Sequence, residues 1–103
     1  MTEVRLATEA MAELAEAVLW YEGRNEGLGS ELLDEVEQVL PRIRAMPESF
    51  PRLVDAPEDL EIRRALLPRF PYALVFIATL TEIQIIAVAH TKRRPGYWLD
   101  RVR

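Results

Sequence analysis

The sequence contains no cysteine and only one histidine, and these two scarcities exclude several classes of protein. Without thiols the chain cannot form a disulfide framework, a thiolate zinc site, an iron–sulfur cluster or a thiol nucleophile. A single histidine also excludes a metal site made of histidines alone. We therefore expect no metal and no cofactor in this protein.

Long apolar runs are missing too. Apolar runs such as residues 85–89 are far too short to span a bilayer, and the amino-terminal residues lack the pattern of a secretory signal. Seven prolines and four glycines are too few for a disordered or fibrous chain. A length of 103 residues, 50% of them apolar, predicts one domain over residues 1–103, which we expect in the cytoplasm and not in a membrane.

Charge is divided unevenly along the chain. Residues 1–60 hold five arginines and fourteen acidic residues, whereas residues 61–103 hold eight lysines or arginines and three acidic residues. Such asymmetry within one domain indicates a surface that is suited to an anionic partner. The acidic residues of the first half follow helical spacing, which we interpret as a solvated face and not as a metal or glycosidase site. This acidic set comprises Glu9, Glu13, Glu16, Glu31, Asp34, Glu35 and Glu37.

The apolar pattern of the first half predicts a short strand followed by a helical hairpin. Apolar and polar residues alternate over residues 4–6, which predicts the strand. Thr8 follows at a position where its hydroxyl can cap a helix over residues 9–24. Glycines then predict a turn, and a second apolar stripe predicts a second helix antiparallel to the first. Pro41 lies inside that second helix, where we expect a kink or an early end.

The second half predicts a β-sheet. Residues 47–59 contain three prolines and predict an irregular connector. Residues 60–67, 72–79 and 82–90 are rich in β-branched and aromatic side chains and predict three consecutive antiparallel strands, the middle one covered on both faces. Residues 99–103 predict one further helical turn. The expected fold is α+β, with the helical hairpin on one face of a small antiparallel sheet. Opposite it we expect a basic concave surface formed by the later strands and the carboxy-terminal turn.

Six short motifs follow one another along the chain and resemble a known family. They are Trp20-Tyr21-Glu22, Gly27-Leu28-Gly29, Ile62-Arg63-Arg64, Arg69-Phe70-Pro71-Tyr72, Ile85-Ile86-Ala87-Val88-Ala89-His90 and Arg93-Arg94-Pro95-Gly96-Tyr97-Trp98. In this order and spacing, and with the predicted elements around them, the motifs resemble the RelE/ParE superfamily of bacterial toxins, in its ParE-like or plasmid-stabilisation branch. The resemblance covers nearly the whole chain.

The resemblance implies a growth-inhibiting toxin of a type II toxin–antitoxin system, held silent in a hetero-oligomer by a cognate antitoxin. ParE-like members poison DNA gyrase without catalysis, whereas RelE-like members cut messenger RNA on the ribosome. RelE-like nucleases tend to have a catalytic arginine directly after the motif Phe70-Pro71-Tyr72, and this chain has Ala73 there. The resemblance thus implies gyrase as the target. A ribosome-dependent endoribonuclease and an inactive member that serves only as an interaction module are the two alternatives.

A nuclease without metal needs a group that moves protons and cations that stabilise the phosphorane. Histidine titrates near neutrality, so His90 is the best general acid or base, with Tyr97 as the other candidate. Arg93 and either Arg63 or Arg64 would stabilise the charge, because strand alternation places Arg63 and Arg64 on opposite faces. The structural alternatives are that His90 caps a carbonyl or packs on a ring, and that Arg63 and Arg64 are solvated at an outer strand.

The strongest signal for target binding is a basic and aromatic segment after the last strand. Its cations suit phosphates or an acidic protein groove, and its rings suit base stacking. The structural alternative is that the rings cover the open end of the sheet while the cations stay in water. The segment comprises Lys92, Arg93, Arg94, Tyr97 and Trp98. An aromatic pair at the end of the first helix, Trp20 and Tyr21, is interpreted as core.

Overall fold

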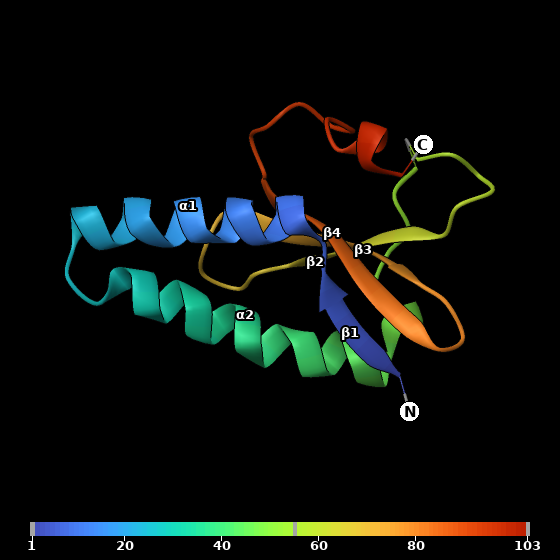
Figure 1. Ribbon diagram of the computed structural model, residues 1–103, viewed down its shortest axis with the longest axis horizontal. Coiled ribbons are helices and arrows are strands. Elements are labelled where there is room, and N and C mark those ends of the chain that lie inside the picture. The colour runs from blue at the N-terminus through green and yellow to red at the C-terminus, as the bar shows by residue number, and fades with distance from the viewer. Residues whose placement is uncertain (1, 55, 103) are drawn as a thin grey trace.

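The computed structural model describes residues 2–54 and 56–102 and shows two helices packed on a four-stranded sheet (Figure 1). The elements in chain order are β1 (Glu3–Leu6), α1 (Thr8–Arg24), α2 (Leu28–Ala45), β2 (Ile62–Leu66), β3 (Tyr72–Ala78) and β4 (Glu82–His90). Two short 3-10 helices, η1 (Pro47–Ser49) and η2 (Leu99–Arg101), lie in the connector and near the carboxy terminus. The predicted α+β architecture is confirmed.

The sheet has the strand order β1-β4-β3-β2 and is mixed. Strands β2, β3 and β4 form the predicted antiparallel meander, but β1 pairs parallel to β4 and joins Glu3 with Glu82 through Leu6 with Ile85. The expectation of a wholly antiparallel sheet was therefore wrong for its first strand. A four-residue apolar alternation indicates a strand but not the strand beside which it lies.

Both helices differ from their predicted boundaries. The N-cap of α1 is Ala7, no side chain caps the first turn, and Thr8 is already helical. Helix α2 does not end at Pro41 but continues to Ala45. A proline inside a helix costs about 3 kcal/mol, yet Val39 and Ile43 on either side of it are buried in the core. This tertiary packing, which the local pattern does not report, holds the last turn in place.

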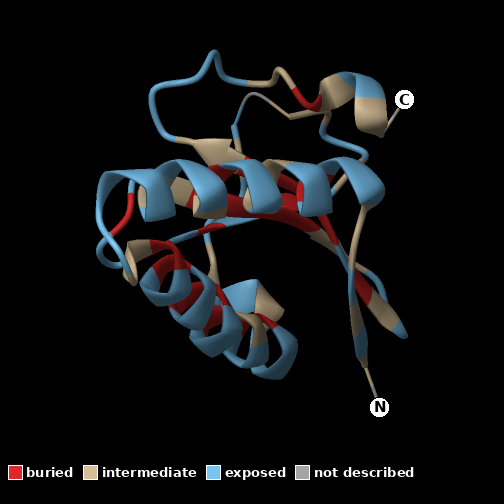
Figure 2. Ribbon diagram, turned by 60° about the vertical axis from the view of Figure 1, so that its left-hand side comes forward, coloured by how far each residue is buried: buried red, intermediate tan, exposed pale blue. Residues whose placement is uncertain are grey.

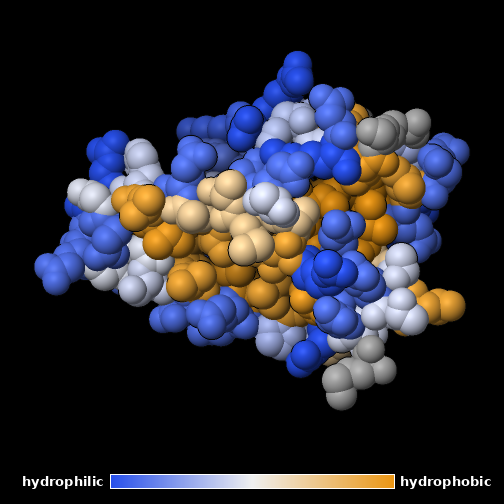
Figure 3. Space-filling model, in the orientation of Figure 1, coloured by the Kyte–Doolittle hydropathy of each residue, from blue (hydrophilic) through white to orange (hydrophobic). Residues whose placement is uncertain are grey.

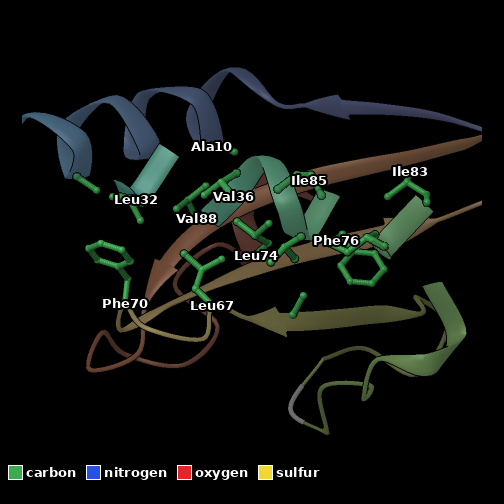
Figure 4. Close-up of a cluster of buried hydrophobic side chains, with 14 residues drawn as sticks. Ala10, Leu32, Val36, Leu67, Phe70, Leu74, Phe76, Ile83, Ile85 and Val88 are labelled. Atoms are coloured by element: carbon green, nitrogen blue, oxygen red, sulfur yellow. The ribbon is translucent and has the colours of Figure 1, made fainter. Parts of the chain in front are cut away.

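The main hydrophobic core lies between the helical hairpin and the sheet (Figure 4). Leu32 and Val36 of α2 meet Leu74, Phe76 and Ile85 of the strands, all of them at most 1% exposed. Figure 2 shows that the buried residues of both helices face the sheet and each other, while their outer faces are largely exposed. Burial of this stripe supplies the main driving force that fixes the hairpin on the sheet.

A second apolar cluster covers the opposite face of the sheet. Ile62, Val75 and Ile86 project there and pack with Trp98 from the carboxy-terminal segment and Leu53 from the connector. That segment lies on the side of the sheet away from α2 (Figures 1 and 2). Strand β3 is thus covered on both faces, as predicted. The carboxy-terminal segment and the connector cover part of this far face, and a hollow remains between them and the strands.

The turn between the two helices is closed by a carboxylate. The backbone N–H groups of Gly27 and Gly29 donate to Glu22 Oε2 at 2.9 Å and Oε1 at 3.0 Å. Gly27 has φ 91°, a left-handed conformation that glycine adopts without strain. At Gly29 the two helices come so close that a Cβ would lie 2.6 Å from the carbonyl oxygen of Val18. The Gly27-Leu28-Gly29 motif is therefore a packing requirement of the hairpin.

Apolar side chains also remain on the outer face of the hairpin (Figure 3). Met11 and Leu19 of α1 are 58% and 72% exposed, and Trp20 is 54% exposed. The prediction that Trp20 and Tyr21 are both core is wrong for Trp20, whereas Tyr21 packs against the main core. None of the helices in the described part of the chain has the length and apolarity needed to cross a membrane.

Candidate functional site

A groove of about 320 Å³ lies beside the second apolar cluster, on the far face of the sheet. Its floor contains Ala73, Val75 and Ala89 of the two central strands. One wall is the connector, through residues 51–54 and Ala56, and the other is the turn over residues 93–98. We call this feature the basic groove.

The name follows from its cationic side chains. Five of the lining residues can carry positive charge, namely Arg52, Arg64, His90, Arg93 and Arg94. None of the described lining residues is an aspartate or a glutamate. The basic half of the sequence thus converges, together with Arg52 of the connector, on one hollow in the surface. Lys92 is exposed beside the groove and is not among its lining residues.

Arg63 and Arg64 lie on opposite faces of β2, as strand alternation predicted. Arg63 Nη1 donates to the carbonyl oxygen of Phe50 at 2.7 Å, on the face that packs against the helices. Arg64 pairs in register with Val75, is exposed, and lines the basic groove. Arg63 therefore ties the connector to the edge strand, and only Arg64 is available to a ligand in the groove.

His90 ends β4 at the border between the basic groove and a second cavity of about 340 Å³. Its Nδ1 accepts a hydrogen bond from the backbone N–H of Lys92 at 3.0 Å, so the neutral ring carries its proton on Nε2. The ring also meets the edge of Tyr72, with centroids 5.1 Å apart. The ring contact predicted for a structural histidine is thus present, and the backbone group that His90 caps is an amide, not a carbonyl.

Glu13 of α1 is the centre of a partly buried polar cluster, which we call the Glu13 cluster. Its carboxylate accepts from the Tyr97 hydroxyl at 2.7 Å, from the backbone N–H of Val88 at 2.9 Å, and from both terminal nitrogens of Arg101 at 2.9 Å. Arg93 Nη1 is 3.6 Å away. The side chains of Glu13 and Arg101 are only 14% and 19% exposed. The prediction that Glu13 belongs to a solvated face is wrong.

The position of the Glu13 cluster follows from the length of β1. Strand β1 pairs with β4 only as far as Ile85, so backbone groups of β4 beyond that point have no neighbouring strand on this edge. Glu13 accepts from the Val88 amide, and Arg101 Nη1 donates to the Ile86 carbonyl at 3.0 Å. Buried backbone groups need such partners. The ion pair therefore takes the place of a missing stretch of strand.

These contacts fix the protonation of the cluster. Burial raises the pKa of the Glu13 carboxyl, but hydrogen bonds from Arg101, Tyr97 and Val88 outweigh it and lower that pKa below its ordinary value. Burial, and then the hydrogen bond to Glu13, strongly raises the pKa of the Tyr97 phenol. The hydrogen bond to Glu13 raises the pKa of Arg101. Tyr97 is thus held as a protonated donor, which is the wrong state for a general base.

The two rings of the basic segment are occupied within the chain. Arg93 lies over the Tyr97 ring with its Cζ 3.9 Å from the centroid, and Arg101 lies 5.2 Å from the same centroid. Trp98 is 5% exposed and belongs to the second apolar cluster. Both rings therefore pack within the chain, as the structural alternative predicted, whereas Arg93 is not left wholly in water but lies over Tyr97.

A buried acid, Glu35, anchors the loop before β3. Glu35 of α2 is 7% exposed and accepts from the backbone N–H of Arg69 at 2.8 Å and from its Nε at 3.0 Å. Glu31, one turn earlier, accepts from Arg69 Nη1 at 3.2 Å. The hydrogen bonds to Glu35 and Glu31 raise the pKa of Arg69. The solvated-face interpretation is thus wrong for Glu35 as well, since its helix faces this loop.

Sequence reasoning missed Glu13 and Arg101 as site residues. They are 88 positions apart, and the contact arises only when α1 and the carboxy-terminal segment meet at the edge of β4. The sequence carries no signal for such a pair. Across residues 2–54 and 56–102, no group of three or more histidine, aspartate or glutamate side chains is arranged to hold a metal ion.

The comparisons with known proteins bear on the fold. No protein-family profile and no curated protein sequence matches this chain. Among solved structures, the chain is similar to one from the "Chromosomal ParDE TA system from P. aeruginosa", with a TM-score of 0.66 and 19% sequence identity. The match covers 89% of this chain and 98% of that one.

At this identity, the similarity shows a shared fold. The chain therefore has the α+β fold of a protein in a ParDE toxin–antitoxin system, with a helical hairpin on a small mixed sheet. This is the ParE-like fold that the order and spacing of the six sequence motifs predicted.

Proposed function

We propose that this chain is the ParE-like toxin of a type II toxin–antitoxin system, which inhibits bacterial growth and is neutralised by a cognate antitoxin. The observation that carries the proposal is the match to a chain of a ParDE system over 98% of that chain's length. The six sequence motifs independently favour the same family. In this proposal the protein acts in the cytoplasm and is stored there as a hetero-oligomer with its antitoxin.

The chemistry of the site favours a toxin that acts by binding. Tyr97 is held protonated by Glu13, and Glu13 also engages Arg101 and Arg93. Ala73 places a methyl group on the groove floor, at the position where the family resemblance implies a catalytic arginine in nucleases. These features support the gyrase-binding branch. The target-binding segment then comprises Lys92, Arg93 and Arg94, with Tyr97 and Trp98 as its internal support.

A ribosome-dependent messenger nuclease is the second candidate, and one observation favours it. His90, Arg64 and Arg93 line the same groove, so a proton-moving group lies near two cations. In that mechanism His90 transfers protons while the arginines stabilise the phosphorane. Catalysis by Tyr97 and a role for Arg63 in the groove are not supported by their contacts.

Growth of a bacterial host under controlled expression tests the proposal. We expect viable counts to fall after induction of the chain, and to recover when the small reading frame adjacent to its gene, the expected antitoxin, is expressed with it. Unimpaired growth at a verified level of folded protein would contradict the proposal. That result would favour the inactive interaction module.

Messenger cleavage in a reconstituted translation system separates the two mechanisms. We expect messenger to remain intact with the wild-type protein, because the proposed toxin has no catalytic group. Cleavage that disappears in His90→Ala or Arg93→Ala, but persists in Arg44→Ala, would establish the nuclease instead. Arg44 is a suitable control because it is an exposed arginine of α2 that does not line the groove.

A further inference from the structure

The cationic side chains around the basic groove differ in how many contacts they make within the chain. Arg93 lies over Tyr97 and 3.6 Å from Glu13, and Arg52 Nη2 donates to the carbonyl oxygen of Glu58 at 3.4 Å. Arg64 and Arg94 are exposed, and neither makes a side-chain hydrogen bond or ion pair with the described part of the chain. A guanidinium has five donors, so two complete sets of donors face the groove unused.

The floor of the groove is apolar and is made of small side chains. It offers Ala73, Val75 and Ala89, and Trp98 borders it. A volume of about 320 Å³ admits only a few side chains. The groove therefore combines apolar contact with two charge-assisted donors, which suits carboxylates that alternate with small apolar groups.

The same residues disfavour single-stranded nucleic acid as the occupant. Binding of single strands uses exposed aromatic faces on which bases stack. Here the Tyr97 ring lies beneath Arg93 and beside Arg101, and Trp98 is buried. The groove keeps the cations that such a site needs but not the stacking platforms.

We propose that the basic groove binds an acidic segment of the toxin's target protein, with Arg64 and Arg94 as the residues that recognise its carboxylates. The inference rests on the proposed function for the existence of a protein target. It extends the target-binding surface from the carboxy-terminal turn to Arg64 on β2. It also assigns Trp98 to apolar support beside the floor and not to direct recognition. Charge complementarity carries it, because the groove is lined by four arginines, namely Arg52, Arg64, Arg93 and Arg94.

A binding assay on the full-length protein tests this chemistry. The probe is a fluorescein-labelled decapeptide of alternating glutamate and alanine, with a glutamine–alanine decapeptide and a uridine decamer of RNA as comparisons. We expect the glutamate peptide to bind at least about tenfold more tightly than either comparison, as expected from one charge-assisted hydrogen bond, and to weaken with salt.

Charge-removal variants locate the site. Arg64→Ala and Arg94→Ala should each weaken binding of the glutamate peptide by about tenfold, and Arg44→Ala should leave it unchanged. Both groove arginines are exposed, so these variants are expected to fold, which thermal melting checks. Tighter binding of the RNA, equal binding of the two peptides, or equal effects of Arg64→Ala and Arg44→Ala would each overturn the inference.

A growth assay with charge-reversal variants tests this inference separately from the proposed function. Co-purification with the antitoxin tests whether the groove binds the antitoxin instead of the target. Arg64→Glu and Arg94→Glu should abolish growth inhibition while the variants still co-purify with the antitoxin. If the wild type inhibits growth and the charge-reversal variants inhibit it equally, the groove inference fails and the proposed function stands. If the wild type does not inhibit growth, the proposed function fails. Loss of antitoxin binding in the same variants would assign the groove to the antitoxin and overturn the inference.

Discussion

At the scale of single residues, Glu13 combines several structural roles. It closes the edge of β4, pairs with Arg101, and holds the Tyr97 hydroxyl and, more loosely, Arg93. A carboxylate with this many partners is nearly satisfied although it is largely buried. The residue that looked like part of a solvated helix face therefore organises the carboxy-terminal segment.

Replacement of that carboxylate measures its contribution to stability. We expect Glu13→Gln to lower the free energy of unfolding by about 2 kcal/mol, because Arg101 loses its ionic partner while it stays largely buried. Urea denaturation followed by circular dichroism measures this change. The matched control is Glu37→Gln on the exposed face of α2, which should change stability by less than about 0.5 kcal/mol. Equal effects of the two substitutions would contradict the assigned role.

Acid should remove the same stabilisation. The pKa of Glu13 is lowered in the folded state from an ordinary value of 4.5, so its contribution is fully present above that value and declines as the pH falls through the folded-state pKa. The stability difference between wild type and Glu13→Gln should thus be constant near neutrality and shrink below about pH 4.5. Denaturation curves at several pH values test this. A difference that persists unchanged to pH 2 would argue against an ionised, hydrogen-bonded Glu13.

A substitution at Tyr97 tests whether its hydroxyl stabilises the fold or takes part in catalysis. Tyr97→Phe keeps the ring under Arg93 but removes the hydroxyl that donates to Glu13, which should cost about 1 kcal/mol of stability. Because the proposed toxin acts by binding, the variant should still inhibit bacterial growth. Thermal melting and growth curves measure the two effects. A stably folded Tyr97→Phe protein that no longer inhibits growth would show that the hydroxyl itself is needed.

At the scale of elements, the hairpin depends on one close approach. Gly29→Ala would place a Cβ 2.6 Å from the Val18 carbonyl oxygen, whereas a Cβ at Gly23 would meet nothing within 4 Å. We therefore expect Gly29→Ala to destabilise the protein by about 1–3 kcal/mol, and Gly23→Ala to be neutral or to stabilise it by up to about 1 kcal/mol. Melting temperatures compare the two. Similar shifts for both would contradict the packing that is assigned to the turn.

The elements also show how far local sequence determines structure. The apolar patterns predicted the hairpin and the meander, and β4 has the predicted bounds at residues 82–90. The errors lie where distant parts of the chain decide the outcome. Pro41 remains helical because Val39 and Ile43 are buried, and β1 pairs parallel to β4 although no local signal specifies its partner.

The sequence predicted which residues make up the basic part of the candidate site, but not which side chains contact one another there. The clustering of Lys92, Arg93 and Arg94 after the last strand indicated a basic surface, and alternation separated Arg63 from Arg64. The contacts of Glu13 with residues 75 to 88 positions away could not be inferred, because they depend on how α1 crosses the sheet edge. The burial of Trp98 likewise depends on a second cluster that only the tertiary fold creates.

At the scale of the whole molecule, two apolar clusters sandwich one small sheet. The helical hairpin covers one face, and the carboxy-terminal segment with the connector covers the other. The basic groove lies within this second cover, so its shape depends on segments outside the helices and strands. Under the proposed function, we therefore expect substitutions at Trp98 or Glu13 to change growth inhibition and stability together. Substitutions at the exposed Arg64 and Arg94 should change growth inhibition alone.

The most direct test of the central claim, that this chain is a ParE-like toxin which acts by binding, is a DNA supercoiling assay with purified gyrase. We expect the wild-type protein to stall supercoiling or to make cleaved DNA accumulate, and Arg94→Ala to do so only at higher concentration. Arg44→Ala should match the wild type. Undisturbed supercoiling at protein concentrations well above that of gyrase would contradict the account.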